Sequence, residues 1–165
     1  MGIPAADVNV YYSFVCLTAP VSGVLISGIL YNKMGGYNSA RAYVLTAIFG
    51  FFACIFGLPV PFTYNKYIVY VLLWMVFFFG ATILAPMVAI MLNSVASERR
   101  TAANSIATML YNLVGYLPSP FIYGAVSDAF ANPMTGERVA VGVTLYWSIF
   151  SMIFLYSSMF IYLKK

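Results

Sequence analysis

Three polar side chains stand out in a long apolar stretch in the second half of the chain. Thr108, Tyr111 and Asn112 supply two hydroxyl groups and an amide, which donate and accept hydrogen bonds. Pro118 and Pro120 follow closely and lack the backbone N–H that a helix needs, so we expect an interrupted helix here. Because interrupted helices in membranes often hold substrate, the three residues are candidate substrate-binding residues. The alternative is that Asn112 only hydrogen-bonds a neighbouring helix, a contact that contributes about 0.6 kcal/mol on average.

Catalytic and metal-binding groups are scarce in this sequence. It has no histidine and only two cysteines, Cys16 and Cys54, each alone in an apolar run. No paired carboxylates or clustered cysteines offer an acid, a base, a nucleophile or a set of metal ligands. We therefore expect no enzyme, no metal and no cofactor. Ser148 and Ser151 lie in another apolar stretch, where serines commonly bond the backbone of their own helix.

The apolar stretches are long enough to place these groups inside a membrane. Of the 165 residues, 63% are hydrophobic and 7% are charged, whereas about a quarter of a soluble domain is charged. A membrane-crossing helix needs about 20 mostly apolar residues and satisfies its own backbone hydrogen bonds in lipid. The sequence therefore predicts an all-α membrane protein with about five transmembrane helices and no Asp, Glu, Lys, Arg or His within a span. The predicted spans are residues 9–31, 42–61, 67–92, 101–127 and 139–163.

The basic residues divide unevenly between the two ends of these spans. Because the connections alternate sides, six basic residues fall on one side and two on the other. Cytoplasmic loops carry an excess of Lys and Arg, which puts the larger group and the C-terminus in the cytoplasm. The net charge of +4 is spread between apolar runs, so it indicates topology and not nucleic-acid binding. The cytoplasmic group is Lys33, Arg41, Arg99, Arg100, Lys164 and Lys165, in loops 32–41 and 94–100 and at the C-terminus; the opposite group is Lys66 and Arg138, in loops 61–66 and 128–138.

Small residues at four-residue spacing predict faces where helices approach one another closely. One such face lies on the first span and another on the third. We expect both to be left partly unfilled within this chain and to invite a further helix. The faces consist of Ala19, Gly23 and Ser27, and of Ala81, Ala85 and Ala89.

The loop after the first span carries a short motif of glycines and a base. It resembles the cytoplasmic-loop signature of the major facilitator superfamily, Gly-x-x-x-Asp-Arg/Lys-x-Gly, with an asparagine in place of the acid. The resemblance implies a turn that takes part in gating at the cytoplasmic end. The residues assigned to this loop motif are Gly28, Asn32, Lys33 and Gly35, together with Arg99 and Arg100 before the fourth span.

The fourth span carries a longer and more specific pattern. An Arg-Thr-Ala start is followed by a glycine, a Pro-Ser-Pro break and a Gly-x-x-Ser-Asp end. This pattern is similar to helix eleven of spinster-type and organic-anion-type facilitators. The resemblance implies that residues 1–165 correspond to family helices eight to twelve, part of the C-terminal helix bundle, with helices one to seven outside this sequence. The residues of the break are Gly115, Pro118, Pro120, Gly124 and Asp128.

The two motifs also occupy related positions. Gly28-x-x-x-Asn32 ends the first span on the predicted inner side, and Gly124-x-x-x-Asp128 ends the fourth on the outer side. Facilitator halves contain inverted three-helix repeats, in which these two helices correspond.

Taken with the candidate residues, the resemblance implies part of a secondary active or facilitative transporter that moves a lipid-like or organic solute by alternating access. The alternative is a non-transporting structural subunit, derived from a facilitator and packed in a larger complex. The expected partners are the lipid bilayer, the missing N-terminal helices or another membrane subunit, and a small organic or lipid-like substrate.

Overall fold

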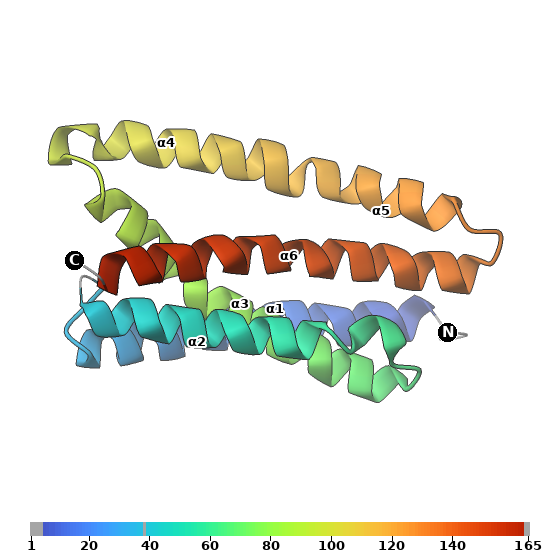
Figure 1. Ribbon diagram of the computed structural model, residues 1–165. Coiled ribbons are helices and arrows are strands. Elements are labelled where there is room, and N and C mark those ends of the chain that lie inside the picture. The colour runs from blue at the N-terminus through green and yellow to red at the C-terminus, as the bar shows by residue number, and fades with distance from the viewer. Residues whose placement is uncertain (1–4, 38, 164–165) are drawn as a thin grey trace.

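The chain folds into long helices joined by short loops (Figure 1). The computed structural model describes residues 5–37 and 39–163, and no strand occurs within these ranges. Two short 3-10 turns flank the third helix, and a six-residue π-helical segment lies between the fourth and fifth helices. The elements are α1 (Ala5–Lys33), α2 (Ala40–Gly57), η1 (Val60–Phe62), α3 (Lys66–Asn93), η2 (Ser97–Arg99), α4 (Arg100–Leu110), η3 (Tyr111–Tyr116, the π segment), α5 (Pro118–Asp128) and α6 (Pro133–Leu163).

Four of the helices are long and apolar enough to cross a membrane. They cover Asn9–Lys33, Arg41–Phe62, Lys66–Asn93 and Pro133–Ile161, close to four of the predicted spans. The remaining predicted span is not one long helix but α4, η3 and α5, which follow one another along a single rod (Figure 1). At 1.5 Å per residue this rod is ~43 Å long, enough to cross a bilayer. The prediction of an all-α membrane protein is confirmed.

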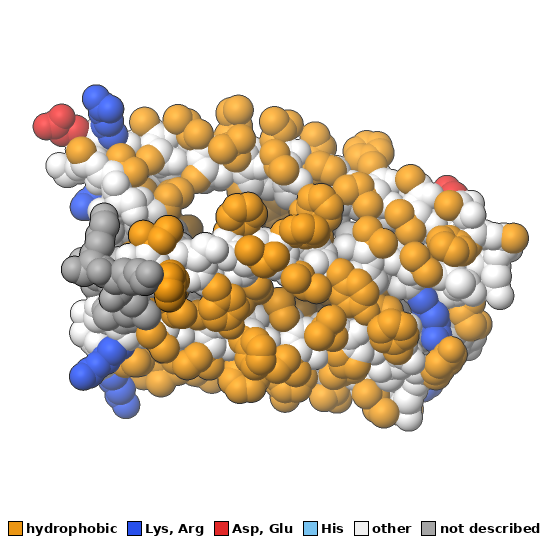
Figure 2. All heavy atoms as spheres, viewed as in Figure 1, with side chains coloured by type: hydrophobic (Ala, Val, Ile, Leu, Met, Phe, Trp, Pro, Cys, Tyr) orange, Lys and Arg blue, Asp and Glu red, His pale blue; other side chains and the backbone are white. Residues whose placement is uncertain are grey.

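The helices run back and forth between two charged ends. α6 lies between α2 on one side and the α4–α5 rod on the other, and α1 and α3 pack together beside α2 (Figure 1). Figure 2 shows the Lys, Arg, Asp and Glu side chains of this face at the two ends, with hydrophobic side chains between them. The C-terminal ends of α1 and α6 lie at the same end of the bundle as the α3–α4 connection, and the α2–α3 and α5–α6 connections lie at the other.

This arrangement agrees with the alternation on which the topology prediction depends. Which end faces the cytoplasm stays a prediction. Lys164 and Lys165 lie outside the described residues.

The small-residue faces of α1 and α3 correct part of one expectation, because they pack closely against one another around Gly23 and Ala81. Ala19 and Ser27 are fully buried, and Ala81 is 5% exposed. A methyl group added at Gly23 would collide with the carbonyl oxygen of Phe78 and crowd the Ala81 methyl. Glycine is needed at this position because the two backbones come this close, as in other membrane helix pairs with small residues at the crossing. The prediction that these faces stay partly unfilled is wrong for the first-span face and for Ala81, whereas Ala85 and Ala89 are only half-buried.

The start of α6 corrects a second expectation. The 128–138 connection was expected to be a loop, but α6 begins at Pro133 and includes Glu137 and Arg138. Asn132 caps the helix: its side-chain oxygen accepts a hydrogen bond from the Met134 N–H at 3.1 Å. Proline directly after the cap fits the first helical position, where no N–H partner is required. The charged residues mark the end of the apolar run and not the end of the helix.

Candidate functional site

The predicted interruption of the fourth span takes the form of a π-helical segment, Tyr111–Tyr116. The Leu117 N–H donates to the Asn112 carbonyl at 2.9 Å. The two residues are five positions apart, whereas the bonded residues of an α-helix are four apart. The cause lies directly downstream, because Pro118 and Pro120 cannot donate to the carbonyls four residues before them and their rings would crowd those carbonyls. A wider turn relieves this crowding. π segments of this kind inside helices are frequently found at functional sites.

The three candidate substrate-binding residues lie at the start of this π segment. The Asn112 amide donates to the Thr108 carbonyl at 2.9 Å, and the Thr108 hydroxyl donates to the Asn104 carbonyl at 2.8 Å. The Tyr111 hydroxyl lies 3.2 Å from that of Tyr116, and the two rings meet edge to face. In this conformation the polar groups are therefore satisfied within their own helix. Asn112 bonds its own backbone and, among the described residues, no neighbouring helix.

This part of the chain is open to its surroundings. None of the described residues of α4, η3 or α5 is buried. Tyr111 is 49% exposed and Tyr116 is 62% exposed. Figure 2 shows a gap between α4 and the rest of the chain, near the α3–α4 connection. The structure thus brings the three polar residues together on an uncovered surface, and they do not line an enclosed pocket.

Three glycines and the acid of the two motifs lie within α1, the π segment and α5. Gly115 and Gly124 have open space where a side chain would begin, so neither is required for close packing within the described chain. Asp128 is the last residue of α5. Gly28 lies in α1 with similar free space around it.

The loop after α1 needs glycine for its backbone conformation. Gly35 and Gly36 have φ angles of +93° and +83°, which other residues rarely adopt. The Gly36 N–H donates to the Tyr31 carbonyl at 2.9 Å and closes the end of α1, where Asn32 and Lys33 are both exposed. Arg99 ends η2 and Arg100 begins α4 at the same end of the bundle (Figure 1). The loop and the two arginines thus share one end, and their gating role stays a prediction.

Below the Tyr31 carbonyl, a buried hydrogen bond joins α1 to α2. The Tyr31 and Thr46 hydroxyl oxygens lie 2.8 Å apart, and both side chains are fully buried. This bond fixes the α1–α2 hairpin at the end that carries the loop motif. Sequence reasoning did not single out either residue, because tyrosine and threonine are common in apolar spans.

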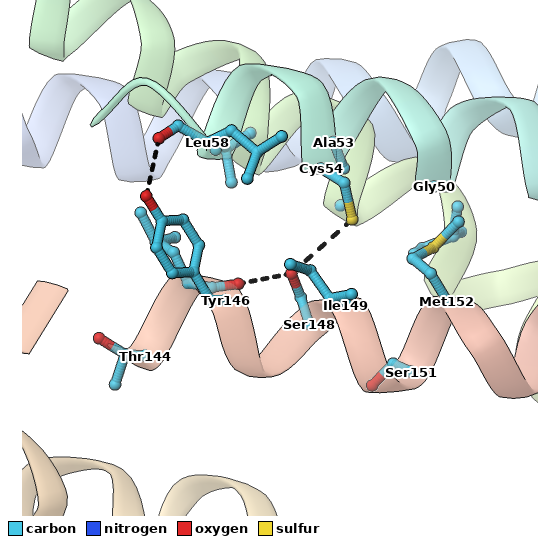
Figure 3. Close-up of a pocket in the computed structure, with 15 residues that line it drawn as sticks. Gly50, Ala53, Cys54, Leu58, Thr144, Tyr146, Ser148, Ile149, Ser151 and Met152 are labelled. Carbon is cyan, nitrogen blue, oxygen red and sulfur yellow. Dashed lines mark hydrogen bonds between the residues drawn. The ribbon is translucent and has the colours of Figure 1, made fainter. Parts of the chain in front are cut away.

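A separate cavity of about 200 Å³ lies between α2, α3 and α6 (Figure 3). On α6, Ser148 lies 3.8 Å from the Cys54 sulfur of α2, and its hydroxyl donates to the Leu145 carbonyl at 2.6 Å. The expectation that Ser148 bonds its own backbone is confirmed. None of the candidate substrate-binding residues lines this cavity. Sequence reasoning missed it, although two glycines that line it, Gly57 and Gly80, leave room between the helices.

Comparison with known proteins finds a family model that matches part of the chain. Residues 63–130 match the model of the Organic Anion Transporter Polypeptide (OATP) family. No curated protein and no solved structure matches the chain. The matched segment contains α3, α4, the π segment and α5. The part of the chain that carries the interrupted helix and its three polar residues is therefore similar to a family of organic anion transporters.

Proposed function

We propose that this chain forms part of a transporter that moves an organic or lipid-like solute across a membrane by alternating access. The strongest support is that two features occur in the same segment of the chain. The segment similar to an organic anion transporter family is the same segment that contains the π-helical interruption. Transporters commonly place their substrate at interrupted helices near the bilayer midplane.

The interrupted helix offers suitable groups for binding a solute. The Asn112 amide, the Thr108 hydroxyl and the Tyr111 hydroxyl are accessible and lie within two turns of one helix. Their present partners belong to the same helix, so a solute can replace these bonds without separating two helices. The aromatic rings of Tyr111 and Tyr116 supply an apolar surface beside the polar groups.

The π segment also supplies a mechanical element. Wide turns and proline breaks are the usual positions at which a membrane helix bends. α5 packs along α6, whereas α4 touches little of the described chain. A bend at η3 would therefore move α4 while α5 stays against α6, and so open or close one end of a pathway.

A pathway along α4 and α5 needs a second wall opposite them. Helices that cover the exposed side of α4 and α5 would form this wall. We propose that these are further helices of the same transporter. The 165-residue chain by itself is then expected to transport nothing and to co-purify with a partner or self-associate.

Uptake in cells tests this proposal. Cells that produce the protein in its native membrane would be compared with cells that lack it, using a panel of fluorescent organic anions and lysophospholipids. We expect saturable uptake of at least one class, and we expect Asn112→Ala to reduce it several-fold. Asn104→Ala is the matched control, because Asn104 is equally exposed on the same helix but lies two turns before the π segment. Equal uptake with and without the protein would overturn the proposal.

The alternative function is that of a structural subunit in a larger membrane complex. The uncovered surface of α4, η3 and α5 favours it, because such a surface suits a partner helix as well as a solute. The same variants separate the two functions. A subunit requires that Asn112→Ala leave all uptake unchanged while truncation of exposed side chains such as Leu113 and Val114 dissociates the complex.

A further inference from the structure

The cavity between α2, α3 and α6 lies outside the proposed solute pathway, and its chemistry is different. It is lined mostly by apolar side chains and glycines, and it is partly open to the surroundings. Three of the polar side chains at its wall, Thr144, Tyr146 and Ser148, already have hydrogen-bond partners. The Tyr146 hydroxyl donates to the Leu58 carbonyl at 3.0 Å, and Ser148 donates to the Leu145 carbonyl (Figure 3). Water needs two to four polar partners in a buried site, so this cavity suits an apolar occupant.

The size of the cavity limits what that occupant can be. A volume of about 200 Å³ is below the ~300 Å³ at which pockets for whole drug-sized ligands begin. It exceeds the ~150 Å³ of an engineered apolar cavity that stays dry and binds benzene. The space therefore suits one segment of a hydrocarbon chain.

An arginine lies on the same face of α6, closer to the N-terminal end of that helix than the cavity is. Arg138, Gly142 and Tyr146 follow at four-residue spacing and contact Tyr64, Pro61 and Leu58 in turn. The guanidinium of Arg138 lies 3.9 Å from the centre of the Tyr64 ring. Its Nε is buried without a hydrogen-bond partner, and no described acidic side chain forms an ion pair with it. The charge is thus held in place by an aromatic ring and has no counter-ion among the described residues.

The spacing between Arg138 and the cavity matches the dimensions of a lipid. Along the helix axis the cavity residues Tyr146 and Met152 lie ~12 and ~21 Å from Arg138, at 1.5 Å per residue. One leaflet contributes ~15 Å of hydrocarbon. A phosphate bound at the arginine would therefore place its own acyl chain at the level of the cavity.

We propose that the face formed by α2, α3 and α6 binds one phospholipid from the bilayer, with its phosphate on Arg138 and one acyl chain in the cavity. Arginine binds phosphate oxygens through its fork of N–H donors, and the ring of Tyr64 keeps that fork at the edge of the apolar run. This site does not depend on the proposed transport function, since it requires only that the helices lie in a membrane.

Native mass spectrometry of the protein purified in detergent tests this proposal with named probes. These are palmitoyl-oleoyl-phosphatidylglycerol, dioleoylglycerol, which lacks the phosphate, and inorganic phosphate. We expect one phosphatidylglycerol to be retained per chain, with weaker retention of dioleoylglycerol. Arg138→Gln should weaken binding of phosphatidylglycerol about tenfold, the size expected for hydrogen bonds to a charged group, and leave dioleoylglycerol unchanged.

A cavity-filling variant tests the acyl-chain half of the site. Gly80 lines the cavity, and a Cβ added there meets no atom within 4 Å, so we expect the side chain of Gly80→Leu to occupy the cavity. It should weaken the binding of both lipids at least tenfold. Gly124→Leu is the matched control, because Gly124 also has open space but lies on α5, away from the cavity. Helicity and elution volume identify variants that fold, and Gly57→Ala serves as a milder cavity variant with only an ordinary contact to Val76.

Two results would overturn the proposal. One is equal retention of lipid by wild type and Gly80→Leu. The other is that inorganic phosphate releases phosphatidylglycerol equally well from wild type and from Gly80→Leu. That result would mean that Arg138 binds free phosphate and that the cavity does not hold an acyl chain.

Discussion

The hydrogen bond between Tyr31 and Thr46 allows a directional prediction about the α1–α2 hairpin. The Thr46 hydroxyl oxygen lies 2.7 Å from the Ala42 carbonyl and 2.8 Å from the Tyr31 hydroxyl. Because threonine has a single hydroxyl hydrogen and the carbonyl can only accept, Thr46 donates to Ala42. Tyr31 must then be the donor to Thr46. Both side chains are fully buried, so neither has water as a substitute partner.

Because Tyr31 is the donor, the two single substitutions should lower the free energy of unfolding by different amounts. Tyr31→Phe removes the donor and leaves Thr46 bonded to Ala42, so we expect a cost of about 0.6 kcal/mol, the average for such membrane pairs. Phenylalanine also keeps the ring contact with Tyr37, whose centroid lies 5.2 Å away. Thr46→Val instead leaves the Tyr31 hydroxyl buried without an acceptor, which costs about 1–3 kcal/mol. Removing both hydroxyls leaves no unsatisfied donor, so the double variant should be more stable than Thr46→Val alone.

The assay is unfolding of the purified protein in mixed micelles with rising SDS, followed by helical circular dichroism. Thr46→Val should unfold at the lowest SDS fraction, and adding Tyr31→Phe should raise that fraction again. The reasoning would be refuted if Tyr31→Phe were the more damaging single change, or if the costs of the two changes simply added in the double variant.

Three further predictions follow from the described helices. Replacing Pro118 and Pro120 together by alanine restores two backbone donors, so we expect a gain of about 1–3 kcal/mol in unfolding free energy and slower uptake; unchanged uptake would show that the bend is not used. Gly23→Leu forces side-chain atoms into the α3 backbone and should destabilise the protein by about 1–3 kcal/mol in the same SDS assay. A neutral effect would argue against the close contact between α1 and α3. In a cysteine-free background, cysteines at Gly36 and Asn132 should react with an impermeant maleimide from opposite sides of sealed vesicles, and reaction from one side would contradict the topology.

Much of the helical framework could be predicted from the sequence, because the lipid environment restricts the solutions. Long uncharged runs must be helical in a bilayer, and charged residues mark their ends. The ends of α3, for example, fall within one residue of the predicted span 67–92. The interruption was predictable from the pair Pro118 and Pro120, which removes two backbone donors within one turn, whereas the single prolines Pro20 and Pro86 leave α1 and α3 continuous.

Other features depended on contacts that one sequence does not specify. The face around Gly23 could have met any small-residue partner, and only the fold shows that the α3 face fills it. The charges at Glu137 and Arg138 suggested a loop, whereas the Asn132 cap and Pro133 start a helix before them. The cavity is lined by glycines from two helices, Gly57 and Gly80, that are distant in sequence. Its existence is a property of packing, which the order of residues along one helix does not determine.

The central claim is that the interrupted helix contacts the transported solute, and cysteine protection at position 112 tests it most directly. In a cysteine-free background, Asn112→Cys would be labelled with a small thiol reagent in membranes, with and without the solute that is taken up fastest in the uptake panel. Position 112 is exposed, so labelling should be rapid without solute. We predict that the solute slows labelling several-fold at position 112 and leaves Asn104→Cys unaffected. Equal labelling rates at position 112 with and without a saturating, transported solute would contradict the account.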